Sequence, residues 1–126
     1  DLNNALKNAD IISFHCKPNK DGSSIINTNE INQMKSNAVI INTARGNLVS
    51  EIDLCDAIKN KKIAGAAIDV FDTEPAIKNI LFGLENVLLT PHIAASTSEA
   101  QIIVAEMVAN QFVDYFLKNK VNNSVI

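Results

Sequence analysis

The sequence predicts an α/β protein, in which a parallel β-sheet carries helices on both of its faces. Short apolar runs rich in β-branched residues recur along the chain, as is typical of buried strands. Segments with helical spacing or with helix-capping residues separate these runs. Strands and helices that alternate in this way indicate a parallel sheet, because each helix returns the chain to the end where the next strand begins.

The first third of the chain holds two of the apolar runs. Before the first of them, Leu2, Ala5 and Leu6 share one face of a helical pattern that Asp10 ends. The expected elements are the end of a helix over residues 2–8, a buried strand over 11–14, a loop marked by Pro18 and Gly22, a short helix capped by Thr28 and continuing through Met34, and a buried strand over 38–42.

Two patterns that resemble capping boxes mark the later helices. Ser50 with Asp53 opens a helix to about Asn60, and Ser96 with Glu99 opens the longest helix, to about Lys118. The first of these helices is expected to bury Ile52, Leu54 or Cys55, and Ile58. The remaining expected elements are strands over 64–69 and 87–89, a connection containing Pro75 between them, and an extended tail over 121–126.

Composition and charge argue against several classes of function. The 126 residues are 47% hydrophobic and 20% charged, and the net charge is −3 with lysines scattered along the chain. This balance argues against nucleic acid or an anionic membrane surface as the main partner. No apolar stretch approaches the ~20 residues that span a bilayer. Two cysteines and two histidines form no disulfide or metal framework, which favours a reduced cytoplasmic setting.

Arg45 is the only arginine, in a chain that otherwise uses lysine for its positive side chains. A guanidinium group can hold a carboxylate through two parallel hydrogen bonds, which an ammonium group cannot do. Arg45 therefore predicts a site for a small carboxylate ligand.

Other reactive side chains are expected at the same edge of the sheet, because ligands of such sheets bind at the carboxyl ends of the strands. Histidine exchanges a proton near neutral pH, and a neighbouring glutamate can orient its ring. With a carboxylate-binding arginine, this pair suits the oxidation of an alcohol beside a carboxylate, with a nicotinamide accepting the hydride. The residues that end or follow the expected strands are His15, Thr43, Ala44, Arg45, Asp69, Glu74 and His92.

These residues lie in blocks that resemble the signature of the D-2-hydroxyacid dehydrogenases. The blocks are residues 40–46, 64–71, 73–75 and 89–93, and they occur in the family's order and with similar spacing. The resemblance implies a Rossmann-like nucleotide-binding fold and an NAD-dependent oxidoreductase that acts on a small 2-hydroxy or 2-oxo acid. NADP stays open as the cofactor.

The resemblance also implies a role for each matching residue. Arg45 binds the substrate carboxylate, His92 is the acid and base, and Glu74 is its partner. The cofactor-binding residues implied are Thr43, Ala44, Arg45, Asp69, His92, Ala94, Ala95 and, lining the site, His15. Thr43 and Ala44 lie near the nicotinamide ribose, and Asp69 binds the carboxamide.

The phosphate-binding motif of this family, G-x-G-x-x-G, is absent from the chain, whose glycines stand at 22, 46, 65 and 83. We therefore expect a fragment: residues 1–100 as the C-terminal half of an NAD-binding domain, and 101–126 as a helix and tail leading to a substrate-binding domain. Alone, it is expected to be inactive. Family resemblance implies a homodimer of the parent enzyme.

Within the family, residues 95–101 are most similar to phosphoglycerate dehydrogenases. This implies oxidation of 3-phosphoglycerate to 3-phosphohydroxypyruvate, a step toward serine. The alternatives are a glyoxylate/hydroxypyruvate or D-lactate type of reductase, and, in another class, a corepressor-like binding protein on the same fold.

Overall fold

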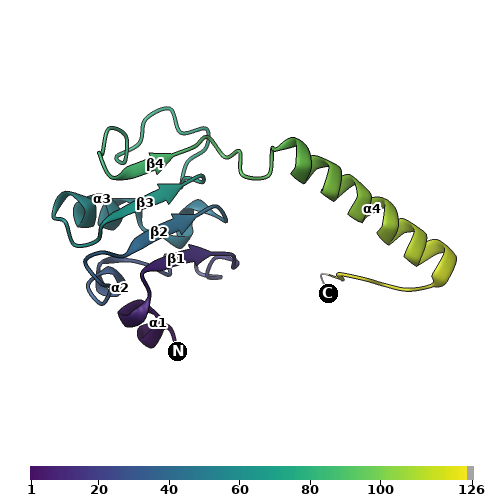
Figure 1. The fold of residues 1–126 in the computed structure, drawn as a ribbon, viewed down its shortest axis with the longest axis horizontal. Coiled ribbons are helices and arrows are strands. Elements are labelled where there is room, and N and C mark those ends of the chain that lie inside the picture. The colour runs from purple at the N-terminus through teal and green to yellow at the C-terminus, as the bar shows by residue number, and fades with distance from the viewer. Residues whose placement is uncertain (125–126) are drawn as a thin grey trace. The chain divides into compact units, whose positions relative to one another are not determined.

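The computed structural model describes residues 1–124, and its first compact unit is built on four parallel strands (Figure 1). The strands follow chain order across the sheet, so that each one is added at the same side as the last. Parallel pairing brings all their carboxyl ends to one edge. This confirms the expected α/β class and parallel sheet. The strands are β1 (Ile11–Phe14), β2 (Val39–Asn42), β3 (Gly65–Ile68) and β4 (Val87–Leu89).

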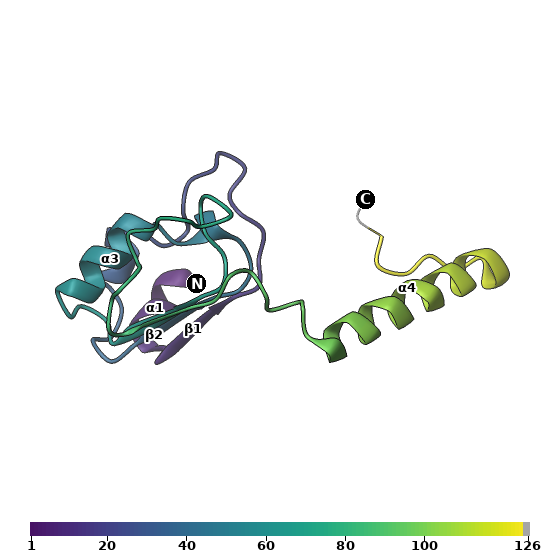
Figure 2. The same cartoon turned by 90° about the horizontal axis from the view of Figure 1, so that it is seen from above.

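One face of the sheet carries the hydrophobic core. Ile40 pairs with Ile12 on one side and with Ala66 on the other, and its side chain is fully buried. Figure 2 shows the helices on this side of the sheet. They are α1 (Leu2–Asn8), α2 (Thr28–Ile31) and α3 (Glu51–Lys59), and they contribute Leu6, Ile31, Leu54 and Ile58 to the core.

No helix of residues 1–92 covers the opposite face of the sheet. Ile11 and Leu88 are 63% and 67% exposed there, because side chains alternate between the two faces along a strand. Right-handed crossovers that all progress in one direction place their helices on one side. The expectation of helices on both faces is therefore corrected for this unit, which forms a single helical layer. The expected buried strand over residues 11–14 is fully buried only at Phe14.

The cap and the end of α2 differ from the expected ones. Asn27, rather than Thr28, caps the helix through a reciprocal capping box with Glu30. Glu30 lies three residues after Asn27, which is the spacing that lets its carboxylate reach back to the N–H of the cap. The helix ends at Ile31, before Met34.

Ser50 caps α3 as expected, and its Oγ accepts the N–H of Asp53 at 3.3 Å. The side chain of Asp53 does not complete a capping box. It accepts instead from the hydroxyl of Thr28 at 2.8 Å, because aspartate is one methylene shorter than the glutamate that usually reaches back. Ile52 was expected in the core but is 65% exposed, and the buried residues of the helix are Leu54, Cys55, Ala57 and Ile58.

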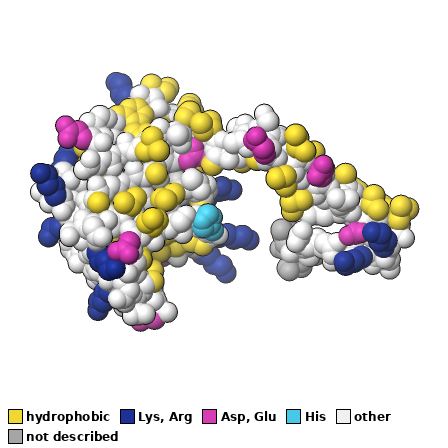
Figure 3. Space-filling model, viewed as in Figure 1, with side chains coloured by type: hydrophobic (Ala, Val, Ile, Leu, Met, Phe, Trp, Pro, Cys, Tyr) yellow, Lys and Arg dark blue, Asp and Glu magenta, His cyan; other side chains and the backbone are white. Residues whose placement is uncertain are grey.

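The second compact unit begins at Ile93 and is built on α4 (Ser98–Lys118). Thr97, rather than Ser96, caps this helix by accepting the N–H of Ala100 at 3.1 Å. No residue of α4 is buried, and Figure 3 shows hydrophobic side chains along it. No helix among the described residues is both long and apolar enough to cross a membrane.

The rest of this unit bears on two further expectations. The boundary between the two compact units falls between His92 and Ile93 in the chain. The expected domain division after residue 100 stays a prediction. Of the tail expected to be extended, residues 121–124 form no helix or strand, and residues 125–126 lie outside the described range.

Replacing matched isoleucines by alanine in the full-length protein tests which side chains form the core. Ile40→Ala should lower the free energy of unfolding by about 2–5 kcal/mol, because it leaves a cavity under the helices. Ile52→Ala should change it by no more than about 0.5 kcal/mol, as is usual at exposed positions. Urea unfolding measures both values. Equal losses at the two positions would contradict the core described above.

Candidate active site

Asn42 shapes the turn that presents Arg45 at the carboxyl end of β2. Its side chain is 1% exposed, and its amide group donates to the carbonyl of Arg45 at 2.8 Å and accepts the N–H of Ala44 at 3.1 Å. The guanidinium of Arg45 is exposed, and its Nη1 donates to the carbonyl of Ala44 at 2.6 Å. The buried asparagine therefore fixes the backbone of the turn, while the arginine side chain stays accessible to a ligand.

Gly46 brings this turn against the segment that follows β3. A Cβ atom at position 46 would overlap the carbonyl group of Phe71 and lie 2.5 Å from the amide nitrogen of Asp72. Only a residue without a side chain allows the two backbones to approach this closely. The contact therefore sets the spacing between Arg45 and the segment that carries Glu74.

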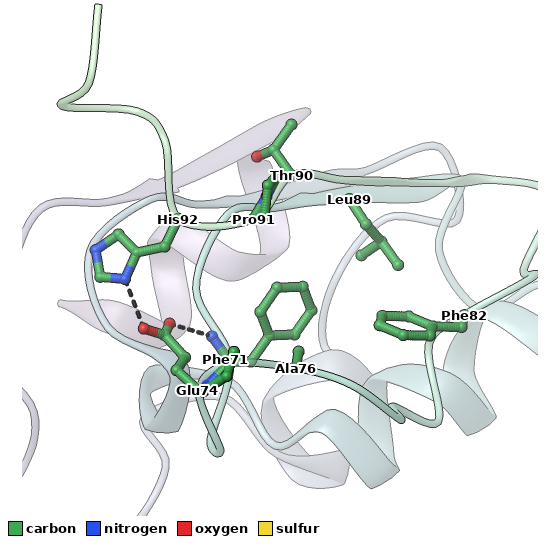
Figure 4. Close-up of a pocket in the computed structure, with 9 residues that line it drawn as sticks. Phe71, Glu74, Ala76, Phe82, Leu89, Thr90, Pro91 and His92 are labelled. Atoms are coloured by element: carbon green, nitrogen blue, oxygen red, sulfur yellow. Dashed lines mark hydrogen bonds and ion pairs between the residues drawn. The ribbon is translucent and has the colours of Figure 1, made fainter.

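Glu74 and His92 form a hydrogen-bonded pair at the ends of β3 and β4 (Figure 4). His92 Nδ1 lies 2.6 Å from Glu74 Oε2, and Glu74 Oε1 accepts the N–H of Phe71 at 2.9 Å. The hydrogen bond to His92, and next the one from the Phe71 amide, hold the pKa of Glu74 below its ordinary value. Glu74 is therefore ionised near neutral pH. Its hydrogen bond to Nδ1 fixes the orientation of the histidine ring.

Arg45, Glu74 and His92 line one cavity of about 460 Å³. Gly46, Asn47 and residues 70–72 complete its lining. The side chain of His92 is 48% exposed, so the imidazole is accessible from the cavity. The structure thus brings together the three residues expected to be catalytic. A cation for a carboxylate and an imidazole for a proton both face the same space.

A second cavity, of about 380 Å³, lies at the carboxyl ends of β1 and β2 and shares Arg45 with the first. Thr43, Ala44 and His15 line it, as do residues 16–18. The ring of His15 is held by Ser13, whose Oγ lies 2.9 Å from Nε2. Small and polar side chains beside the first cavity are suited to a bound cofactor that must reach the same ligand.

A third cavity, of about 560 Å³, shares Glu74 and His92 with the first and is largely apolar. Figure 4 shows two aromatic rings in it, from Phe71 and Phe82, and these pack edge to face with their centroids 6.3 Å apart. The other lining residues are Pro75, Ala76, Leu89, Thr90 and Pro91. Glu74 and His92 therefore lie between a polar and an apolar cavity.

Asp69, Ala94 and Ala95 lie outside the three cavities. Asp69 is 3% exposed and its carboxylate accepts the hydroxyl of Thr90, while its N–H donates to the carbonyl of Asn42 at 2.9 Å. Asp69 thereby ties the ends of β2, β3 and β4 together. Ala94 and Ala95 belong to the second compact unit. The cofactor contacts expected of these three residues stay predictions.

Several residues that build the site were not expected from the sequence. Asn42 had a weak signal, since a polar residue ends a β-branched run there. The backbone amide of Phe71 had none, because every residue carries the same amide group. The close approach at Gly46 also had none of its own, since it depends on a segment about 25 residues later in the chain.

The sequence is similar to known dehydrogenases. Residues 1–94 match the family model described as D-isomer specific 2-hydroxyacid dehydrogenase, NAD binding domain. A protein of Staphylococcus epidermidis, provisionally named a 2-hydroxyacid dehydrogenase, is 46% identical over 110 residues, which are 87% of this chain and 35% of that protein. A Staphylococcus aureus protein with the same provisional name is 44% identical over 110 residues, with the same shares. The chain thus spans about a third of the length of these relatives.

Solved structures show the same fold. An acyclic imino acid reductase in complex with NADPH and D-Arg has a TM-score of 0.84 and 34% identity, and the match covers 100% of this chain and 40% of that one. For a glyoxylate reductase from Paecilomyes thermophila the values are 0.83 and 31%, with 98% and 38% covered. For a D-lactate dehydrogenase with NAD⁺ from Lactobacillus jensenii they are 0.78 and 30%, with 97% and 40% covered.

Substitutions at Gly46 test whether its close contact supports the site. In the full-length protein, Gly46→Ala should lower the free energy of unfolding by about 1–3 kcal/mol, because the new methyl group must displace the Phe71–Asp72 backbone. Gly46→Leu should lower it further. Gly22 is the control for space, since nothing lies within 4 Å of a Cβ built there. Its φ of +77° strains any side chain, so Gly22→Ala and Gly22→Leu should both cost stability, but by similar amounts. Denaturant unfolding measures the series, and a loss at position 46 that does not grow with side-chain size would contradict the contact.

Proposed function

Because this chain belongs to the D-isomer specific 2-hydroxyacid dehydrogenase family, whose NAD-binding domain it matches, we propose that the full-length protein interconverts a small 2-hydroxy acid and its 2-oxo acid with NAD. The observation that carries the proposal is the single cavity lined by Arg45, Glu74 and His92. The same cavity adjoins a hollow suited to a cofactor. A carboxylate-binding cation beside a histidine–carboxylate pair is the chemistry that this reaction requires.

Each of these side chains has a defined part in the proposed mechanism. The Arg45 guanidinium binds the substrate carboxylate and holds the neighbouring carbon facing His92. Because Glu74 accepts the Nδ1–H of His92, Nε2 is the nitrogen that takes the hydroxyl proton during oxidation and returns it during reduction. The Glu74 carboxylate stabilises the imidazolium that forms. The bound nicotinamide supplies the hydride chemistry.

We propose that Thr43, Ala44 and His15 line the cofactor site, a role consistent with the hollow of small and polar side chains that they form. Asp69, Ala94 and Ala95 are proposed as further cofactor contacts on the family resemblance alone. NAD is the first choice and NADP the alternative, since the similar structures include one with NAD⁺ and one with NADPH.

Two substrate classes are proposed. The similarity of residues 95–101 to phosphoglycerate dehydrogenases supports 3-phosphoglycerate, oxidised to 3-phosphohydroxypyruvate in serine synthesis. A second class comprises glyoxylate, hydroxypyruvate and D-lactate with its oxo acid. The names of two similar structures, a glyoxylate reductase and a D-lactate dehydrogenase, support this second class as the alternative.

The setting and assembly of the protein are also proposed. The family resemblance supports a homodimer. A cytoplasmic location fits the two cysteines, Cys16 and Cys55, which are both free. A binding protein that keeps the fold and the site residues without turnover is the alternative of another class.

Assays of the full-length protein test these proposals. Absorbance of the reduced nicotinamide would be followed with 3-phosphoglycerate, glyoxylate, hydroxypyruvate and D-lactate, each with both cofactors. Formation of NADH from 3-phosphoglycerate is the expected result. Consumption of NADH with glyoxylate, and no reaction with 3-phosphoglycerate, would select the second substrate class. NAD binding without turnover of any acid would support the binding protein.

Arg45→Lys tests the carboxylate-binding role. The substitution keeps the positive charge but removes the two-pronged hydrogen bonding, so kcat/KM should fall by about 10–100-fold, the effect of losing one charged hydrogen bond. Lys59→Arg on the exposed side of α3 is the matched control and should leave the kinetics unchanged. Steady-state kinetics with the preferred acid give the values. Equal kcat/KM for Arg45→Lys and the wild type would remove Arg45 from the proposed mechanism.

A further inference from the structure

Glu51, the first residue of α3, makes two hydrogen bonds to the segment that carries Glu74. Its Oε1 accepts the N–H of Asp72 at 3.0 Å, and its Oε2 accepts the side-chain amide of Asn79 at 2.8 Å. These partners lie 21 and 28 residues later in the chain. One half-buried carboxylate thus holds the segment on both sides of Glu74.

The segment between β3 and β4 contains no helix or strand that could hold it. Phe71 and Leu81 of this segment are buried, whereas residues 72–75 between them are exposed. Asn79 closes the far end, since its Oδ1 accepts the N–H of Leu81 at 2.9 Å. Hydrogen bonds to Glu51 therefore replace the backbone pairing that a strand would have supplied at this point.

The anchored amide of Asp72 stands next to the amide that orients Glu74. The N–H of Phe71 donates to Glu74, and the N–H of Asp72, the next along the chain, donates to Glu51. We propose that Glu51 is a positioning residue for proton transfer at His92, because it fixes the backbone that places the Glu74 carboxylate against Nδ1. This inference rests on the proposed function and adds to it a residue that does not line the cavity of Arg45, Glu74 and His92.

The geometry requires a carboxylate at position 51. Asp72 and Asn79 both present N–H donors, and only a carboxylate can accept at both of its terminal atoms. The negative charge of Glu51, after burial, contributes to raising the pKa of Asp72, so the two carboxyl groups oppose each other. The hydrogen bonds therefore hold the segment despite an unfavourable charge contact. The other charged groups around Glu74 are His92, Asp69 and, across the cavity, Arg45.

Glu51→Gln in the full-length protein tests the inference. It keeps the length and volume of the side chain but turns one acceptor into a donor that faces another donor. Glu85→Gln, an exposed glutamate before β4, removes the same charge and serves as the control. We expect kcat to fall about tenfold with Glu51→Gln, the usual effect of one lost hydrogen bond, and KM for the acid to change little.

A second measurement does not depend on turnover. In NMR spectra of protein labelled at histidine, the Nδ1 proton of His92 should be observed in the wild type and with Glu85→Gln. With Glu51→Gln and with Glu74→Gln it should shift or be lost to exchange. If the wild type turns over no acid but Glu51→Gln still changes this signal, the proposed function fails and the positioning role stands. Unchanged kinetics and an unchanged Nδ1 signal with Glu51→Gln would overturn the inference.

Discussion

The approach of Gly46 to the backbone of Phe71 and Asp72 is the constraint on which the candidate active site depends. Arg45 precedes this glycine, and Glu74 follows the segment that it contacts. A side chain at position 46 would push the two turns apart, and Arg45 would move away from Glu74 and His92. The lack of a Cβ atom at position 46 therefore shapes the site as much as the side chains that line it do.

Hydrogen bonds from buried or half-buried polar groups hold the two turns on either side of this contact. Asn42 fixes the turn that bears Arg45, and Glu51 and the Phe71 amide fix the segment that bears Glu74. Asp69 joins the strand ends behind them. None of these supporting groups belongs to the expected catalytic set. The side chains of Asn42 and Glu51 satisfy backbone amides or carbonyls where the regular pairing of the sheet stops.

The sheet places these turns at one edge because its four strands are parallel, so that all of them end at the same edge. The three α-helices of the first unit all contribute to the core on the face that contains Ile40. The opposite face, with Ile11 and Leu88, stays open in residues 1–92. A chain that spans about a third of the length of its relatives thus places Arg45, Glu74 and His92 around one cavity, on a sheet with one helical layer.

Sequence patterns alone predicted the strands, the parallel order of the sheet, and the edge where Arg45, Glu74 and His92 lie. These patterns are local: β-branched runs, capping residues and the residues that come after each strand. Cap positions were missed by one residue at Asn27 and Thr97, because neighbouring polar residues offer nearly equivalent caps. Ile52 was misplaced because the spacing of a short helix fits more than one buried face.

The folded structure was needed to show which face of the sheet is covered, that Gly46 touches Phe71, and that Glu51 reaches Asp72 and Asn79. These features depend on contacts between residues that are far apart in the chain. A local sequence pattern does not indicate which distant residue a side chain will contact, because the energy of the contact depends on where the rest of the chain has folded.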